Sequence, residues 1–156
     1  MTLPRRQLLA LAGSGLGAFG IAALTAGRAE SAETSALSDT ERTNERTVRD
    51  FCAAWSTLDA NRVGAFFADD AVYRVLETAK PLIGRDAILK FVGTSLMRSQ
   101  KVHFDIHRQY AAGPIVLNER HDHFVSARGE RVFHVAGMFF LKNGKIAEWT
   151  DYVIAT

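Results

Sequence analysis

The sequence predicts a single α+β domain in which helices cover one face of a curved antiparallel sheet. In the N-terminal half the apolar residues mostly recur at the spacing of a helix. After residue 100 apolar residues recur with a period of two, in segments separated by turn signals. Helices followed by a meander of strands are typical of this class. The chain has 156 residues, 47% hydrophobic and 23% charged, which leaves room for one soluble domain and excludes a disordered chain or a multi-span membrane protein.

A long helix is predicted over residues 39–58. Ser38 and Glu41 have the spacing of a capping box, in which each side chain bonds to the backbone N–H of the other. The single cysteine, Cys52, lies in this helix and is interpreted as a small core residue. The apolar residues of the predicted helix recur at helical spacing: Val48, Phe51, Cys52, Trp55 and Leu58.

Three more elements are predicted before residue 100. A short helix covers 61–68 and ends at Asp69-Asp70, a strand covers 71–77, and a helix covers 86–97 after a loop marked by Pro81 and Gly84. We expect the three helices of this half to pack on one face of the sheet.

Four strands are predicted in the C-terminal half. The hairpin signal Asn143-Gly144 joins the last two. Strand 132–142 is apolar on both faces, so both faces must be covered. Helices cover one face, and a second copy of the chain would cover the other, which predicts a homodimer. The predicted strands are 102–110, 115–127, 132–142 and 145–154.

The first 32 residues predict an export signal. Arg5 and Arg6 precede an uncharged, Gly-rich run over 8–24, followed by Arg28 and small residues. This pattern is typical of a twin-arginine signal, which exports folded proteins, so we expect a periplasmic or extracellular protein. The alternatives are a membrane anchor that is not cleaved, although the run is shorter than the about 20 residues of a span, and a cytosolic protein. The remaining divisions are a linker over 33–38 and the domain over 39–156.

The net charge of +2 belongs to the predicted signal. The 19 basic and 17 acidic residues of the chain include three arginines and one glutamate in residues 1–32, so the remainder balances to zero. A neutral domain gives no support to a phosphate-binding or nucleic-acid-binding surface.

Three charged residues interrupt the strand faces. Arg120 and Asp122 share one face of their strand, about 7 Å apart along it. In the last strand Ala147, Trp149, Asp151 and Val153 share a face, and Asp151 is the only charge among these four residues. Because a buried carboxylate needs a cation, we expect an Asp–Arg–Asp row across neighbouring strands. The alternative is an ordinary ion-pair cluster at a sheet edge.

Residues 48–154 resemble the limonene-1,2-epoxide hydrolase group, within the SnoaL-like and NTF2-like superfamily that includes nuclear transport factor 2 and ketosteroid isomerase. The superfamily motifs are Phe66-Phe67-Ala68-Asp69-Asp70-Ala71-Val72-Tyr73 and Gly84-Arg85-Asp86-Ala87-Ile88; the hydrolase motifs are Glu119-Arg120-His121-Asp122 and Trp149-Thr150-Asp151-Tyr152. The resemblance implies a cone of curved, mixed or antiparallel sheet packed with three helices.

The resemblance also implies an activity, the one-step addition of water to an epoxide. It gives Asp122 the role of general acid, Asp151 that of general base and Arg120 that of a bridge between them, with Tyr73 holding the attacking water. The family has an Asn two residues after this Tyr, where the present chain has Val75.

Elementary chemistry is consistent with this reaction. A carboxylic acid at the ring oxygen and a carboxylate that deprotonates water can open an epoxide together, and neighbouring carboxyls hold different protonation states. The sequence contains no phosphate loop and no cofactor fingerprint, so no cofactor is expected. An apolar pocket for a lipid-like or terpene-like epoxide is predicted to involve Leu76, Leu82, Leu96, Phe124, Met138, Phe139, Phe140 and Trp149.

Two other functions remain open at this point. A ketosteroid-isomerase type of proton transfer would favour a pocket without Arg120, and a non-catalytic small-molecule-binding domain would agree with Val75. His121 and His123 have a spacing that can ligate a metal, with His134 on the next strand. No metal site is predicted, because no third ligand is placed. His103 and His107 are interpreted as surface or dimer-contact residues.

Overall fold

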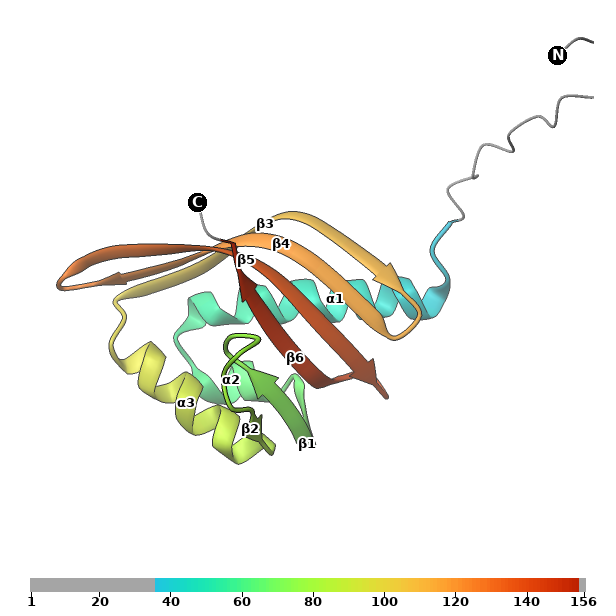
Figure 1. The fold of residues 1–156 in the computed structure, drawn as a ribbon, viewed down its shortest axis with the longest axis horizontal. Helices are drawn as coiled ribbons and strands as arrows, with labels where there is room; N and C mark the ends of the chain where they lie inside the picture. Colours follow the sequence, from blue (N-terminus) through green and yellow to red (C-terminus); the bar gives the residue numbers. More distant parts are fainter. Residues whose placement is uncertain (1–35, 155–156) are drawn as a thin grey trace, which may run out of the picture. The chain divides into compact units, whose positions relative to one another are not determined.

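Three helices pack against the concave face of a curved six-stranded sheet (Figure 1). The computed structural model describes residues 36–154, and the predicted α+β class is confirmed there. The helices are α1 (Asp39–Ala54), α2 (Ala60–Gly64) and α3 (Arg85–Met97), with a 3-10 turn, η1 (Trp55–Thr57), after α1. The strands are β1 (Phe67–Arg74), β2 (Leu82–Ile83), β3 (Lys101–Ala112), β4 (Ile115–Ser126), β5 (Gly129–Lys142) and β6 (Lys145–Val153).

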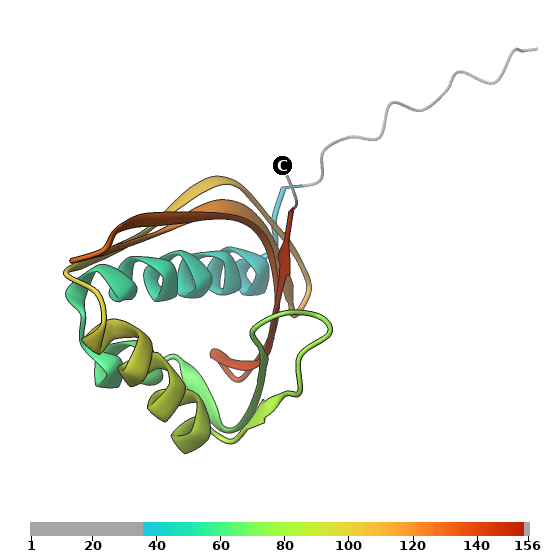
Figure 2. The ribbon, with the colours of Figure 1, turned by 60° about the vertical axis from the view of Figure 1, so that its left-hand side comes forward.

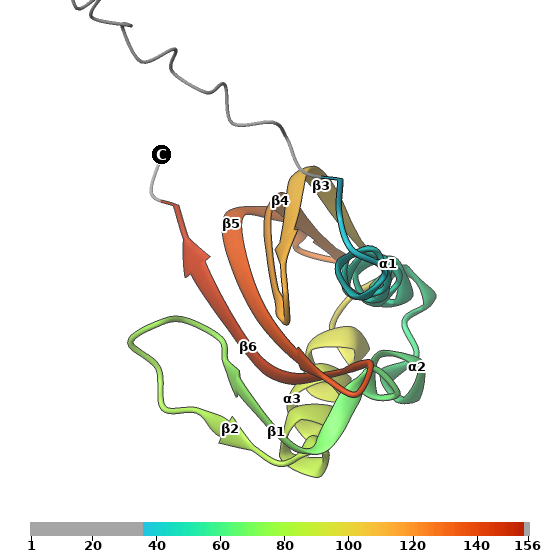
Figure 3. The same ribbon diagram turned by 90° about the vertical axis from the view of Figure 1, so that its right-hand side faces the viewer.

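The strand order is β2-β1-β6-β5-β4-β3. All neighbours are antiparallel except β1 and β6, which pair in parallel and make the sheet mixed. Figure 3 shows β6 beside β1, with the sheet curling from β3 round to β2. This pairing places Tyr73 of β1 directly opposite Trp149 of β6, and thereby joins the N-terminal half to the last strand.

Helix α1 begins as predicted. Ser38 Oγ accepts from the Glu41 N–H at 3.2 Å, and Glu41 Oε2 accepts from the Ser38 N–H at 2.7 Å. After η1 the chain leaves the helical direction at Leu58, whose φ is +54°. Figure 2 shows α1 lying along the concave side of the sheet. Its buried face carries Phe51, whose ring centroid lies 5.0 Å from that of Trp149.

One predicted boundary is wrong. A helix was expected over 61–68 with a strand over 71–77, but α2 ends at Gly64 and β1 begins at Phe67. Asp69 and Asp70 therefore lie inside a strand, where their exposed side chains occupy an irregular stretch of the β1–β6 register. Acidic residues fit such a position because water solvates them there, whereas the inward positions are apolar. The short strand β2 was not predicted.

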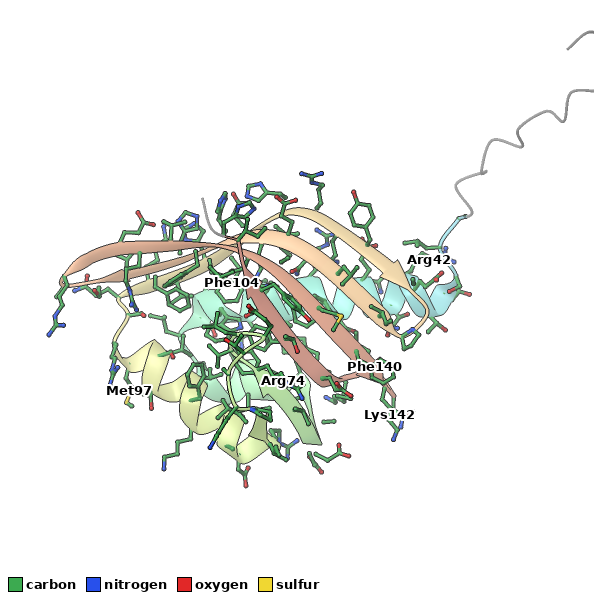
Figure 4. The ribbon with its side chains drawn as sticks, in the orientation of Figure 1. Arg42, Arg74, Met97, Phe104, Phe140 and Lys142 are labelled. Atoms are coloured by element: carbon green, nitrogen blue, oxygen red, sulfur yellow. The ribbon has the colours of Figure 1, made fainter. Side chains whose placement is uncertain are left out.

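The convex face of the sheet bears large apolar side chains that no other described element covers. Side-chain alternation assigns them to this face because their strand neighbours point into the core. Phe140, labelled in Figure 4, is one of them, at 39% exposure. The group comprises Tyr110, Ile115, Leu117, Val132, Met138, Phe140 and Tyr152.

The predicted signal segment, residues 1–32, lies outside the described residues, as does the first half of the predicted linker, residues 33–35. Between residues 36 and 154, none of the helices combines the length and apolar character that a membrane crossing needs. The export route and the predicted domain boundaries stay predictions.

A buried aspartate–arginine–aspartate row as candidate active site

The expected row of charges forms on the concave side of the sheet. Arg120 and Asp122 point inward from β4, and Asp151 points inward from β6. Arg120 is fully buried and each aspartate is 5% exposed. The two strands are not neighbours, since β5 runs between them; the expectation of a row across adjacent strands is therefore wrong in this detail.

Gly137 of β5 makes this crossing possible. It lies opposite Asn118 on one side and opposite Asp151 on the other, so it occupies the middle of the row. A Cβ at this position would overlap Arg120 Nη1 and would lie 2.8 Å from Asn118 Oδ1. Sequence reasoning missed Gly137. Its signal is a single glycine in the middle of an apolar strand, a pattern typical of close approach by another group.

The guanidinium of Arg120 bridges the two carboxylates. Its Nε and Nη2 donate to the two oxygens of Asp122 at 2.7 and 3.1 Å. Nη2 also donates to Asp151 Oδ1 at 2.8 Å. Two-point pairing of this kind is strong and fixes the plane of the guanidinium.

Asp151 receives two further hydrogen bonds. Trp149 Nε1 donates to Oδ1 at 2.7 Å, and the Tyr73 hydroxyl donates to Oδ2 at 3.3 Å. The rings of Tyr73 and Trp149 stack with centroids 3.8 Å apart, so each holds the other in place. Asp151 therefore has three different donor groups, whereas the hydrogen bonds described for Asp122 come from Arg120 alone.

Aromatic rings enclose the arginine. Its Cζ lies 5.1 Å from the Phe104 centroid, 5.8 Å from that of Trp149 and 5.9 Å from that of Phe139. Phe104, labelled in Figure 4, stacks on Trp55 of η1 with ring centroids 4.9 Å apart. Such rings exclude water yet attract a cation through their faces, so the charges of the row act on one another at a low dielectric constant.

Burial governs the ionisation of the row. It raises the pKa of Asp122 to about 6, against the opposing effect of Arg120 and with further help from the charge of Asp151. Burial also raises the pKa of Asp151, but its three donor groups favour the ionised form. Burial raises the pKa of Tyr73 well above its ordinary range, so this hydroxyl keeps its proton. Arg120, Asp122 and Asp151 together carry no net charge when the two carboxyls hold one proton between them.

The predicted pocket residues separate into two groups. Leu96 is buried on α3, Phe124 is half-buried on the concave face, and Trp149 is buried and donates to Asp151 of the row. Met138 and Phe140 were expected in the pocket, but this expectation is wrong, because they point from β5 to the convex face. Their neighbour Phe139 points inward instead, as alternation requires. The predicted pocket residues that remain are Leu76, at 39% exposure after β1, and Leu82 of β2, half-buried against the core.

The five histidines lie on the outer face of β3, β4 and β5, away from the row. His107 Nε2 and His121 Nδ1 are 2.6 Å apart, and the His121 and His134 rings are 4.7 Å apart. His123 contacts Glu130 at 2.9 Å. Within residues 36–154 no group of three or more histidine, cysteine or acidic side chains has the geometry of a metal site.

Comparison with known proteins decides the family. The SnoaL-like domain profile matches residues 48–149. This chain belongs to the SnoaL-like family. Among curated relatives, this chain is similar to the epoxide hydrolase EphG of Mycobacterium tuberculosis, with 36% identity over 127 residues. The matched region covers 80% of this chain and 82% of EphG.

Solved structures agree. An M. tuberculosis LEH-like epoxide hydrolase superposes with a TM-score of 0.63 at 28% identity, covering 73% of this SnoaL-like chain and 84% of that one. A hypothetical protein from Catenulispora acidiphila with a ketosteroid isomerase-like fold has a TM-score of 0.62 at 23% identity, covering 68% and 83%, and shares the fold. These matches confirm the NTF2-like fold and the resemblance to the limonene-epoxide hydrolase group.

Proposed function

We propose that the protein is an epoxide hydrolase that adds water to an apolar epoxide in one step. The observation that carries this proposal is the bridge of Arg120 between two buried aspartates, at 2.7 Å from one and 2.8 Å from the other. A push–pull opening of an epoxide needs a carboxylic acid and a carboxylate held close together, and a bridging cation allows both to be buried.

The roles of the two carboxyls follow from their partners. Asp151 accepts from Arg120, Trp149 and Tyr73, and such bonds stabilise a carboxylate. It is the proposed base. Asp122 has a pKa raised by burial to about 6 and is the proposed acid. Because the two groups interact strongly, they titrate as a pair that shares one proton.

The proposed reaction moves two protons. Asp151 takes a proton from water while the water oxygen bonds to a ring carbon of the epoxide. The carbon–oxygen bond on the far side of that carbon breaks, and the ring oxygen takes the proton of Asp122. A diol is released, and transfer of one proton from Asp151 back to Asp122 restores the pair. Tyr73, which keeps its proton and contacts Asp151, would orient the water.

The surroundings of the row support an apolar substrate. Phe104, Phe139 and Trp149 enclose the charged groups, and Phe124 follows Asp122 on the same face. Since every member of the row is 5% exposed or less, an epoxide must displace side chains to enter. Apolar surface on the substrate compensates for this displacement through the hydrophobic effect.

The test is a diol assay on purified protein with a panel of cyclic and linear epoxides. Asp122→Asn and Asp151→Asn should each lower diol formation by about 100-fold or more, because general acid–base groups contribute on that scale. Asp105→Asn is the matched control. Asp105 is an exposed aspartate on the outer face of β3, so its loss should leave activity unchanged. Full activity in either row variant would remove that residue from the mechanism.

One observation favours a second candidate, a non-catalytic binding domain. Val75, half-buried two residues after Tyr73, cannot hydrogen-bond a water. Neither Asn118 nor Glu77 replaces the hydrogen bond that an Asn at position 75 would make, because Asn118 Oδ1 is bonded to Arg120 and Glu77 is exposed. An apolar epoxide that binds the folded protein without any diol appearing would favour the binding domain over the hydrolase.

A further inference from the structure

Asn118 holds the third corner of the Arg120 guanidinium. Its side chain is 4% exposed, and its Oδ1 accepts from Arg120 Nη1 at 2.9 Å. The Nε and Nη2 corners are occupied by Asp122 and Asp151. All three corners of the cation are therefore bonded, and rotation of the guanidinium in its plane would break at least one bond to a buried acceptor.

The orientation of the Asn118 amide is itself fixed. Its Nδ2 lies 3.7 Å from Cys52 Sγ of α1, which accepts a weak hydrogen bond. A flipped amide would turn its NH2 group toward Arg120 Nη1, donor against donor. Burial raises the pKa of Cys52 to about 12, so the thiol keeps its proton and adds no charge. Gly137, opposite Asn118, leaves room for the side chains of Asn118 and Arg120.

The neutrality of the Asn118 side chain matters as much as its shape. A carboxylate at this position would place three anions around a single cation in a buried site. A neutral carbonyl oxygen satisfies Nη1 and leaves the charge of Arg120 for the two aspartates. The titratable groups that the structure places against the row are Asp122 on β4, Asp151 on β6, Tyr73 on β1 and Cys52 on α1.

We propose that Asn118 is a positioning residue for the proposed hydrolysis: it locks Arg120 in the plane that bridges both aspartates and, by staying neutral, keeps one proton shared between them. This inference rests on the proposed function for its catalytic meaning. Its structural content, a guanidinium held at three corners, can be measured without any substrate.

The first measurement follows the carboxyl carbon of Asp122 by NMR as a function of pH, in the unmodified chain and in Asn118→Asp. The substituted side chain has nearly the same shape but adds a charge. We expect the midpoint of the Asp122 titration to rise by about one pH unit or more, because a neighbouring like charge disfavours ionisation. Asn61→Asp, at an exposed position of α2, is the matched control and should leave the midpoint unchanged. An unchanged midpoint in folded Asn118→Asp would overturn the proposal.

The second measurement is kinetic. In Asn118→Asp the alkaline limb of the kcat/KM profile should move upward together with the NMR midpoint. Asn118→Leu adds no charge and keeps the test open where Asn118→Asp does not fold. It should lower kcat by about 10-fold, with KM changed less than about threefold, as expected for one lost hydrogen bond to a charged group. Unchanged kcat in Asn118→Leu would overturn the positioning role.

The two proposals fail separately. A shifted NMR midpoint in Asn118→Asp, together with no diol from the unmodified chain on any epoxide, would uphold the role of Asn118 in the row and reject the hydrolase. Diol formation in the unmodified chain, together with an unshifted midpoint, would uphold the hydrolase and reject the role of Asn118.

Discussion

Arg120 on β4 donates to Asp151 on β6 across the intervening strand β5, with 2.8 Å between Nη2 and Oδ1. A contact between second-neighbour strands requires that the strand between them present no side chain at that level. Gly137 meets this requirement. The ion pair thus depends on three strands.

Gly137→Ala should disrupt the row. A Cβ there overlaps Arg120 Nη1, so either the guanidinium or β5 must shift, at a cost of about 1–3 kcal/mol in the free energy of unfolding. Diol formation should fall at least 10-fold, because Arg120 loses its alignment with Asp151. Urea unfolding and the diol assay measure both effects.

Gly93→Ala provides the control for Gly137→Ala. Gly93 lies in α3, where the nearest atom to an added Cβ is 3.8 Å away, so alanine should be neutral or stabilise the helix by up to about 1 kcal/mol. Equal stability and activity in Gly137→Ala and the unmodified chain would show that the row tolerates a Cβ, contrary to the geometry described here.

Activity should depend on pH through the proton that Asp122 and Asp151 share. The acid role requires protonated Asp122, whose pKa is about 6, so kcat/KM should fall as pH rises above about 6. At low pH the rate should fall as Asp151 gains a proton. A steady-state pH profile on one epoxide measures both limbs, and a rate that rises steadily from pH 6 to 9 would contradict Asp122 as the acid.

Stability should depend on pH through the same group. The pKa of Asp122 is raised from 3.8 to about 6 on folding, so the folded state binds this proton more tightly than the unfolded state. The contribution of Asp122 is therefore fully present below about pH 3.8 and is lost as pH rises to about 6. Comparing urea unfolding of the unmodified chain with Asp122→Asn over this range isolates the effect, since the variant lacks the titration.

Val75→Asn should accelerate the proposed reaction. The substitution restores a hydrogen-bonding group two residues after Tyr73, where water would otherwise have one partner fewer. One neutral hydrogen bond of about 1 kcal/mol corresponds to a rise of roughly 3- to 10-fold in kcat. KM should change little because the contact is to water. A lower kcat would count against this position of the water.

We also propose that the exposed apolar side chains of the convex face, defined above, lie between two copies of the chain. Leu117, 47% exposed on β4, lies opposite Met138 of β5 within that group. Leu117→Arg should convert a dimer to a monomer in light scattering, because a C2 interface meets each substitution twice. Ile83→Arg, at an equally apolar exposed position on β2, is the control. A monomer in the unmodified chain would refute the interface.

Local sequence patterns were enough to predict most of the elements, although not the start of β1 at Phe67 or the short strand β2. The capping box at Ser38, the hairpin at Asn143-Gly144 and the period of two in the last strands predicted local structure that the fold contains. Alternation also predicted that Arg120 and Asp122 share a face. These features depend on residues that are near one another in the chain, so the pattern of the chain is enough to reveal them.

The face of the sheet that packs against the core, and the pairing of the strands, follow from the folded domain and not from the pattern of any one strand. Residues of β5 are apolar on both faces, so alternation could not tell whether Phe139 or its neighbours Met138 and Phe140 point to the core. Strand order, the parallel pairing of β1 with β6, and the passage of Arg120 over Gly137 depend on contacts between distant segments. Such contacts form where burial and hydrogen bonding are satisfied over the whole domain. The alternation of residues within a single strand therefore does not predict them.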